Sequence, residues 1–202
     1  MLIPSHLSDS ALAALTDGAA VLEKDSHGPK VYRLADGRFL KLFRRKRLIS
    51  SAALRPYSIR FCLNAERLVD RGIPSLQPLA LYKLSDRSLS AVLYRPLAGK
   101  TLKQVYLDAP EAFCNHLPQL AQFIRELHRK GVYFRSLHLG NIVLTPEGAL
   151  GLIDIADLTV QPRPLPKTKA RRNLAHFSRL LDQMGIQDQF PFAELSEAVL
   201  SD

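Results

Sequence analysis

The chain has 202 residues, of which 47% are hydrophobic and 23% are charged, and its net charge is +9. These values are typical of a globular protein with one domain or two small lobes. Its two cysteines indicate neither a disulfide framework nor a zinc cluster, and no apolar run has the roughly 18 residues that a membrane helix needs. Since the first residues also lack the basic start of a signal peptide, we expect a cytoplasmic protein.

The first half of the chain has the pattern of a β-rich lobe. Alternating apolar residues bounded by turn signals predict five strands, at residues 19–24, 30–34, 38–43, 78–84 and 88–97. An Asp-Gly pair between the second and third strands marks a hairpin. Apolar residues at helical spacing predict one helix over residues 57–71, which Gly72 and Pro74 end. We therefore expect an antiparallel sheet with one helix.

The second half has the pattern of a mainly helical lobe. Asp108 and Pro110 mark the start of a helical region, which Pro118 kinks or restarts. From there an apolar stripe runs to Gly131, and it consists of Leu117, Leu120, Ala121, Ile124 and Leu127. Two further helices are predicted after a hairpin and a Pro-rich linker, at residues 169–184 and 192–200.

The order of these elements predicts the fold class. Strands come first and helices second, and the change falls near residues 96–99. This order predicts an α+β fold in a single domain. Its N-lobe covers residues 1–97, and its reduced, mainly helical C-lobe covers residues 98–202.

The segment NIVLTPEGALGLIDI places two polar residues at the ends of a predicted hairpin. Asn141 opens one short strand and Asp154 ends the other, with a tight turn between the strands. Because a hairpin brings its two ends together, we expect an amide oxygen and a carboxylate to face one cavity. Oxygen ligands of this kind suit Mg²⁺ that is held together with the phosphates of a substrate. Each residue alone is also typical of a turn or a helix cap.

Lys41 lies in the third predicted strand, between Leu40 and Leu42. Alternation places its side chain on the opposite face of the sheet from these neighbours. A lysine in that position inside a cleft is a candidate phosphate ligand, which a carboxylate would hold in place. Glu66, near the middle of the predicted helix, is the candidate partner, although it also fits an ordinary exposed glutamate on a helix.

The order of these features resembles the protein-kinase-like fold: lysine, helical glutamate, hinge, long helix, catalytic loop and terminal aspartate. The segment GPKVYRLADGRFLKLFRRK is similar to the N-lobe opening of the lipopolysaccharide kinase family, which acts on Kdo or heptose of the inner core. Some relatives in that group are labelled toluene tolerance proteins. FIRELHRKGVYFRSLHLGNIVL resembles the long helix and catalytic loop, and its LHLGN portion looks like the L-H-x-x-N of aminoglycoside and choline kinases. The resemblance covers residues 20–182.

The resemblance implies ATP and Mg²⁺ as cofactors and assigns four residues to them. Lys41 would bind the α- and β-phosphates of ATP, and Glu66 would orient this lysine. Asn141 and Asp154 would be the metal ligands.

Further roles concern the hinge, the phosphate-covering turn and the catalytic loop. Adenine would lie against main-chain groups of a hinge that runs from Tyr94 to Leu97. Gly28 is the one glycine of a turn that has three in protein kinases, which implies a looser grip on the phosphates. Arg135 would steady neighbouring segments, and His138 stands where small-molecule kinases have a histidine.

Ser136 departs from the family pattern, because this position normally carries the catalytic aspartate. A serine hydroxyl with no adjacent base can orient an attacking hydroxyl but cannot take its proton at neutral pH. His138 is either a substitute base or a packing residue, and Asp157, three residues after Asp154, could lend a second carboxylate. Losing a general base costs on the order of 10²–10⁴ in rate. We therefore expect weak transfer, which Ser136→Asp should raise.

Two basic runs, KLFRRKR and KTKARR, favour an anionic partner. An anionic glycolipid or a phosphorylated sugar would satisfy them, with peripheral contact at the cytoplasmic face of the inner membrane. We expect no nucleic-acid partner, because the basic runs lack interleaved aromatic residues. The sequence predicts an ATP-dependent kinase of lipopolysaccharide biosynthesis. The alternatives are a pseudokinase, which binds nucleotide or serves as a scaffold, and a Bud32-like small protein kinase.

Overall fold

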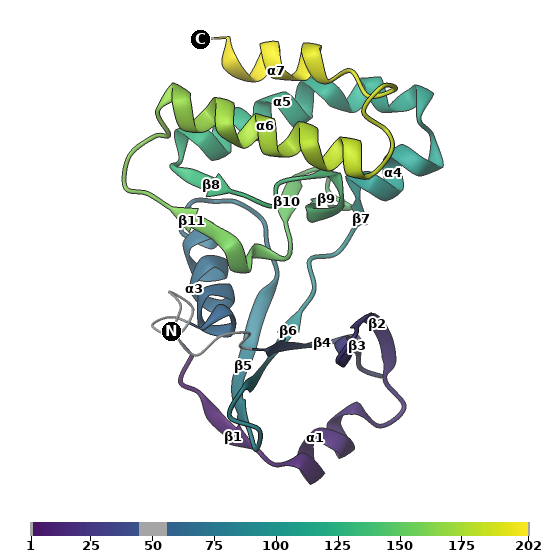
Figure 1. The fold of residues 1–202 in the computed structure, drawn as a ribbon, viewed down its shortest axis with the longest axis vertical. Helices are drawn as coiled ribbons and strands as arrows, with labels where there is room; N and C mark the ends of the chain where they lie inside the picture. The colour runs from purple at the N-terminus through teal and green to yellow at the C-terminus, as the bar shows by residue number, and fades with distance from the viewer. Residues whose placement is uncertain (1, 45–55, 202) are drawn as a thin grey trace. The chain divides into compact units, whose positions relative to one another are not determined.

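The computed structural model describes residues 2–44 and 56–201. Two compact units make up the chain: the N-terminal unit comprises Met1–Val69 and Ser75–Leu97, and the C-terminal unit comprises Asp70–Pro74 and Ala98–Asp202. Figure 1 shows the elements of each unit. The last three residues of the first basic run, Arg45 to Arg47, lie outside the described residues.

The N-terminal unit is built on a six-stranded sheet with the strand order β1-β5-β6-β4-β3-β2. Its strands are β1 (Ser5–Leu7), β2 (Ala20–Asp25), β3 (Gly28–Arg33), β4 (Phe39–Arg44), β5 (Gln77–Leu84) and β6 (Leu89–Arg95). The five predicted strands are confirmed as β2 to β6, and their pairings are antiparallel. β1 is an unpredicted strand that pairs parallel with β5, so the sheet is mixed at this edge.

Two helices of the described chain belong to this unit. α3 (Tyr57–Val69) confirms the predicted helix, but α1 (Asp9–Thr16) shows that the expectation of one helix was wrong. The Ser8 hydroxyl accepts a hydrogen bond from the Ala11 N–H and so caps the start of α1. Asp9 stands in the first turn, where a carboxylate is favourable. These two polar residues therefore start the helix.

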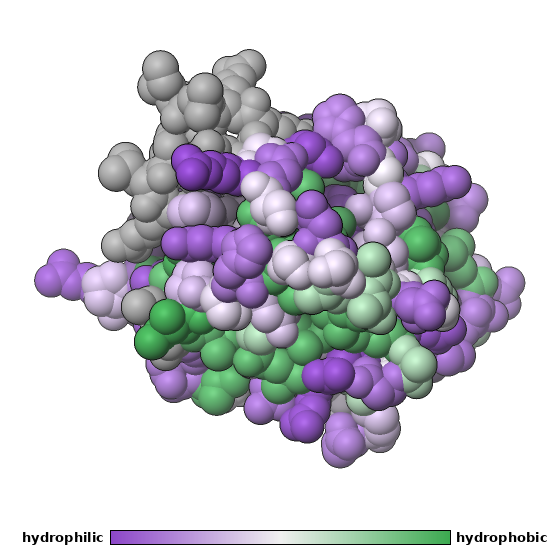
Figure 2. Space-filling model, turned by 90° about the horizontal axis from the view of Figure 1, so that it is seen from below, coloured by the Kyte–Doolittle hydropathy of each residue, from purple (hydrophilic) through white to green (hydrophobic). Residues whose placement is uncertain are grey.

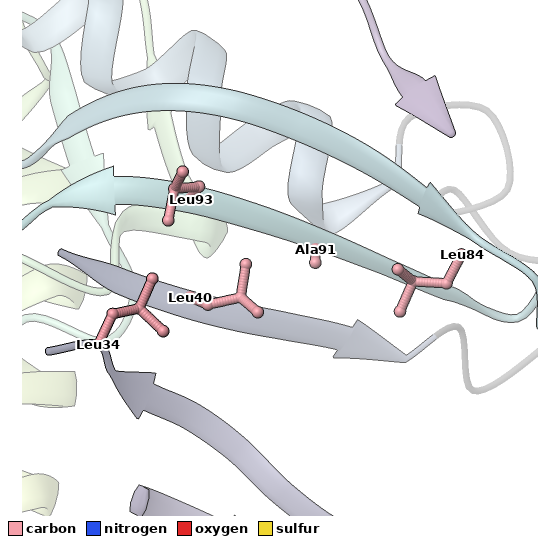
Figure 3. Close-up of a cluster of buried hydrophobic side chains, with 5 residues drawn as sticks. All are labelled: Leu34, Leu40, Leu84, Ala91 and Leu93. Carbon is pink, nitrogen blue, oxygen red and sulfur yellow. The ribbon is translucent and has the colours of Figure 1, made fainter. Parts of the chain in front are cut away.

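A cluster of buried hydrophobic side chains fills one face of the sheet (Figure 3). Its members are Leu34, Leu40, Leu84, Ala91 and Leu93. Leu12 and Leu15 of α1 pack against this cluster, so α1 covers that face. Burying a leucine side chain contributes about 1.5–3 kcal/mol, which makes the cluster a main source of stability for the N-terminal unit.

Some hydrophobic side chains of the N-terminal unit remain exposed. Ile3, Val21 and Leu22 are the examples before and within β2. Figure 2 shows hydrophobic residues, in green, gathered among hydrophilic ones on one face of the molecule.

Over residues 2–44 and 56–201, every helix is too short or too polar to cross a bilayer.

The C-terminal unit combines helices with two small sheets (Figure 1). Its helices are α4 (Leu102–Asp108), α5 (Leu117–Arg129), α6 (Lys167–Gln183) and α7 (Phe192–Leu200), with 3₁₀ turns η1 (Glu111–His116), η2 (Leu139–Asn141) and η3 (Ile155–Asp157). Its strands are β7 (Lys100–Thr101), β8 (Val132–Phe134), β9 (Ile142–Leu144), β10 (Leu150–Leu152) and β11 (Leu158–Val160). β9 pairs with β7 and β10, while β8 pairs with β11. Helices α5 and α6 both pack against α7.

The helical region starts earlier than the sequence pattern indicated. Asp108 ends α4 instead of opening a helix, so that expectation was wrong. The start of α4 is a capping box: the Gln104 N–H donates to the Thr101 hydroxyl, and the Gln104 side chain accepts from the Thr101 N–H. Both orphan donors are thereby satisfied, which fixes the helix start at Thr101.

α5 confirms the predicted apolar stripe, since all five of its residues are buried. Pro118 stands in the first turn of this helix, where proline is tolerated, so it starts the helix and does not kink it. Gly131 follows α5 with φ +72°, and a Cβ there would lie 2.4 Å from the Gln161 carbonyl oxygen. Only glycine therefore allows the linker after β11 to pass this close.

Asn173 ties α6 to both ends of the segment from His128 to Phe134. Its Nδ2 donates to the Phe134 carbonyl at 2.7 Å, and its Oδ1 lies 2.9 Å from His128 Nε2, which donates to it. All of these groups are buried. Buried polar groups depend on such partners, so Asn173 holds in place the start of the loop that follows Phe134.

Removing the Asn173 amide should destabilise the C-terminal unit. Asn173→Ala leaves the Phe134 carbonyl and the His128 imidazole without partners, at a cost of about 1–3 kcal/mol for each group. Thr168→Ala, an exposed change on the same helix, should shift the free energy of unfolding little. Urea unfolding measures both, and equal stability of the two variants would contradict this role of Asn173.

Candidate active site

The hairpin β9–β10 brings the predicted metal ligands to one end. Asn141 directly precedes β9, and Asp154 follows β10 by two residues. The Ile153 N–H donates to the Asn141 carbonyl at 3.0 Å, which holds the two chain segments together. β9 pairs with β10, from Ile142 opposite Leu152 to Leu144 opposite Leu150. This pairing forms the hairpin that the sequence predicted.

The side-chain amide of Asn141 is held in one orientation. Its Nδ2 donates to the Ser136 carbonyl at 2.9 Å, and the residue is only 9% exposed. Because the nitrogen is used in this bond, the amide oxygen is the atom that can act as a ligand. This bond also links Asn141 directly to Ser136, which stands at the position where the resemblance predicts a catalytic aspartate.

Asp154 has a left-handed backbone conformation, with φ 52° and ψ 42°. No other non-glycine residue in the described ranges has a positive φ. This conformation costs roughly 1–2 kcal/mol, so the surrounding structure must hold it. Strain of this kind is typical of functional sites. The buried neighbours Ile155 and Ala156 in η3 fix the turn.

Ser136 has an adjacent carboxylate, which overturns the expectation that no base lies beside it. Its hydroxyl donates to Asp157 Oδ2 at 2.5 Å. The pairing of β8 with β11 explains this contact, because it places Phe134 opposite Leu158. Ser136 follows Phe134 by two residues and Asp157 directly precedes Leu158, so their side chains come close together. The second oxygen of this carboxylate, Oδ1, is buried and has no hydrogen-bond partner in the described chain. Arg135 Nε lies 3.8 Å from Asp157 Oδ2.

The contact with Asp157 also changes what Ser136→Asp should do. A second carboxylate at this position would touch the first one, and two carboxylates in contact cannot both stay ionised. The substitution would also remove the donor that now binds Asp157 Oδ2. We therefore no longer expect Ser136→Asp to raise transfer.

His138 is a capping residue at the start of η2. Its Nδ1 accepts a hydrogen bond from the Gly140 N–H at 3.0 Å, so the neutral ring carries its proton on Nε2. A Cβ at Gly140 would lie 2.8 Å from the His138 Cε1, so this close approach needs the glycine. Burial lowers the pKa of His138, while the carboxylate of Asp154 opposes that shift. A ring whose lone pair is already used is a poor base.

Lys41 and Glu66 both belong to the N-terminal unit. Lys41 is 5% exposed, and its Nζ lies 5.9 Å from the ring centroids of Phe43 and Phe61. It therefore occupies the face of the sheet opposite the Leu40 cluster. Glu66 is exposed on α3. Its negative charge acts on Cys62, whose pKa is raised to about 12 by burial and then by Glu66. The pairing of Lys41 with Glu66 stays a prediction.

The predicted hinge and phosphate-covering turn also lie in this unit. Gly28 has φ +110° and closes the tight turn between β2 and β3. Tyr94 is buried within β6, where its ring packs against Phe39 and Phe61. Leu97 is the last residue of the unit. Their predicted contacts with nucleotide stay predictions.

The residue types at the predicted metal site of the C-terminal unit fit a magnesium ion whose other ligands are the phosphates of a nucleotide. No cluster of three or more His, Cys, Asp or Glu side chains arranged for a metal occurs in residues 2–44 and 56–201. The predicted donors are instead one amide oxygen and one carboxylate, from Asn141 and Asp154, and their role as ligands stays a prediction. Mg²⁺ is commonly held by one or two such groups together with substrate phosphates and water.

Comparison with known proteins bears on the fold. No family model matches the sequence, and no curated protein matches it. The crystal structure of monomeric WbdD matches with a TM-score of 0.53 and 15% identity over 85% of this chain and 44% of that one. A co-crystal structure of WbdD with a kinase inhibitor matches with a TM-score of 0.53 and 13% identity, over 84% of this chain and 42% of that one.

These similarities define the class of the fold. The chain has an α+β, protein-kinase-like fold, with the strands of one unit preceding the helices of the other. It spans less than half the length of the WbdD chains that it matches. At this identity the likeness concerns the fold alone, so the more specific resemblance to lipopolysaccharide kinases stays a prediction.

His138 should make the stability of the protein depend on pH. Folding lowers its pKa below the ordinary value of 6.5, so the unfolded chain binds the proton more readily. The stability that this histidine contributes is therefore complete above about pH 6.5 and is lost as the pH falls below that value. His138→Asn keeps a side-chain oxygen that can accept from Gly140 N–H but removes the titration.

Urea unfolding at about pH 7.5 and about pH 5.5 tests this expectation. Wild type should lose more stability between these two values than His138→Asn does, and the other histidines are common to both proteins. An equal loss in the two proteins, or an NMR titration of His138 with a midpoint above 6.5, would contradict it.

Proposed function

We propose that the protein is an ATP-dependent phosphotransferase that acts on a sugar hydroxyl of the lipopolysaccharide inner core or of a similar anionic glycolipid. The observation that carries the proposal is the hydrogen bond from Ser136 to Asp157, beside an Asn141 whose amide is fixed by the same loop. Ser136 stands where kinases carry an aspartate, and the carboxylate of Asp157 is in contact with this serine. The binding of a kinase inhibitor by WbdD supports a nucleotide site in this fold.

The proposed reaction transfers the γ-phosphoryl group of ATP to the acceptor. A bond forms between the acceptor oxygen and the γ-phosphorus, the bond from that phosphorus to the leaving oxygen breaks, and ADP is released. The Ser136 hydroxyl accepts a hydrogen bond from the acceptor hydroxyl while it donates to Asp157. The acceptor proton passes to Ser136 Oγ as the serine proton passes to the carboxylate. Such reactions depend mainly on positioning and charge.

The other residues bind and position the reactants. In the N-terminal unit, Lys41 is the proposed phosphate ligand, with Glu66 to orient it. In the C-terminal unit, Asn141 and Asp154 are the proposed ligands of Mg²⁺, which when bound would neutralise charge on the phosphates. Arg135 positions the Asp157 carboxylate.

The basic start of α6 supports an anionic acceptor. Within the run KTKARR, the side chains of Lys167, Arg171 and Arg172 are exposed. Each basic residue near an anionic membrane surface contributes about 1 kcal/mol of attraction. A glycolipid at the cytoplasmic face of the inner membrane would meet this surface, so peripheral membrane contact belongs to the proposal.

A pseudokinase is the second candidate function. The observation that favours it is the serine at position 136, together with an Asp154-Ile155-Ala156 sequence that lacks the flexible glycine after the metal aspartate. Such a protein would bind nucleotide without transferring phosphate. The loss of that glycine makes the turn less able to switch conformation.

ATP with Mg²⁺ should stabilise the protein, because a ligand that binds only the folded state raises its melting temperature. At 100-fold excess over the dissociation constant the increase should be about 5–10 °C. Asp154→Ala should remove the part that depends on Mg²⁺, whereas Asp188→Ala, which removes an exposed carboxylate elsewhere in the same unit, should not. A wild-type melting curve that millimolar ATP leaves unchanged would refute the nucleotide site.

Transfer assays with radiolabelled ATP distinguish the candidate functions. The delipidated, phosphorylated inner-core oligosaccharide should accept label, and a generic protein acceptor should not. Label in the protein acceptor alone would favour a Bud32-like protein kinase instead. ATP binding without transfer to either acceptor would establish the pseudokinase.

A further inference from the structure

A pocket of about 340 Å³ opens beside Ser136 in the C-terminal unit. Its lining residues come from the catalytic loop and from α6, and they are Arg135, Ser136, His176, Arg179, Leu180 and Gln183. The four α6 residues follow the spacing i, i+3, i+4, i+7, so they share one face of the helix. Ser136, the serine of the proposed catalytic pair, therefore forms part of the wall of a cavity.

Positive charge dominates this pocket. Arg135 and Arg179 line it, and Arg172 lies one helical turn before His176 on α6. Burial lowers the pKa of His176, and the positive charges of Arg179, Arg172 and Arg135 lower it further. The positive charges of all three guanidinium groups therefore act on His176, which lines the pocket. This histidine stays neutral at physiological pH.

Most of this positive charge is not neutralised by the protein. The charge of Arg135 is offset in part by Asp157, whose Oδ2 lies 3.8 Å from Arg135 Nε. Neither Arg172 nor Arg179 forms an ion pair with any residue in the described part of the chain. Unneutralised guanidinium groups around a concave surface attract an anion from solution.

The shape and chemistry of the wall limit the kind of anion. The planar fork of an arginine binds phosphate or carboxylate oxygens through two parallel hydrogen bonds. The neutral imidazole of His176 and the amide of Gln183 can both donate and accept, as the hydroxyl groups of a sugar require. Leu180 offers an apolar surface for the C–H groups of a sugar ring. The volume lies in the range of pockets that bind small molecules.

We propose that this pocket binds a sugar through its oxyanion group, a phosphate ester or a carboxylate, and so places a hydroxyl of the same sugar against Ser136. This inference rests on the proposed phosphotransferase function. It adds the place where the acceptor binds and the residues that recognise its charge. Arg179 and Arg135 bind the oxyanion, and His176 and Gln183 bind the remaining hydroxyl groups.

Isothermal titration calorimetry without ATP tests the pocket, with glucose 6-phosphate, glucuronate and glucose as probes. At least one of the two charged sugars should bind, and glucose should bind more weakly. Arg179→Gln should weaken binding of the charged sugar by about 10- to 100-fold, as expected for the loss of a charge-assisted hydrogen bond. Arg125→Gln, which removes an exposed arginine of α5 outside the pocket, is the matched control and should have less than about a two-fold effect.

The preferred charged sugar identifies the group that the pocket recognises, a phosphate ester or a carboxylate. Three results would overturn the proposal: no binding of either charged sugar at about 10 mM, equal binding of glucose, or an equal loss in the two arginine variants. A melting temperature of Arg179→Gln without ligand that equals that of wild type confirms that this variant is folded.

The pocket and the proposed function can fail separately. Sugar phosphate binding that depends on Arg179, in a protein that ATP does not stabilise, would leave an oxyanion site without a kinase. Transfer to the core oligosaccharide with the same KM in wild type and Arg179→Gln would leave the kinase and overturn the pocket as its acceptor site.

Discussion

The hydrogen bond between Ser136 and Asp157 joins the two segments on which the candidate active site depends. Ser136 follows β8 and Asp157 precedes β11, and the pairing of these strands brings the two residues within 2.5 Å. Asn141 is tied to the same loop through the Ser136 carbonyl. A carboxylate, a hydroxyl and an amide oxygen are thus fixed relative to one another by strand pairing and by side-chain hydrogen bonds. Preorganised groups of this kind are what phosphoryl transfer requires of a protein.

The rest of the C-terminal unit supports this arrangement. Asn173 of α6 holds the Phe134 carbonyl at the start of the loop, and the same helix contributes Arg179 to the pocket beside Ser136. The left-handed turn at Asp154 lies between the hairpin and Asp157. Helix α6, the β9–β10 hairpin and the paired strands β8 and β11 therefore position the proposed base, the proposed metal ligands and the proposed acceptor pocket. On this account the protein replaces the usual loop aspartate with a serine and takes its carboxylate from the following segment.

Periodic patterns predicted most of the fold. The strands β2 to β6, the helix α3 and the stripe of α5 follow from alternation and helical spacing, and the ends of the β9–β10 hairpin follow from its turn. The capping residues Ser8 and Thr101 mark the starts of α1 and α4, and neither helix start was predicted. The contact of Ser136 with Asp157 was not predictable in this way, because β8 and β11 have three residues each and their pairing is non-local. The pocket could not be predicted either, because it depends on the position of α6 relative to the loop, and no single segment of the sequence determines that position.

A double-mutant cycle on phosphoryl transfer tests the central claim most directly. The rates of Ser136→Ala, Asp157→Asn and the double variant are compared with wild type, on the core oligosaccharide as acceptor. If the two residues act as one unit, each single change should lower the rate by about 10²–10⁴, and the double variant should be no slower than the slower single variant. Losses that multiply in the double variant, or full activity of Asp157→Asn, would contradict the account.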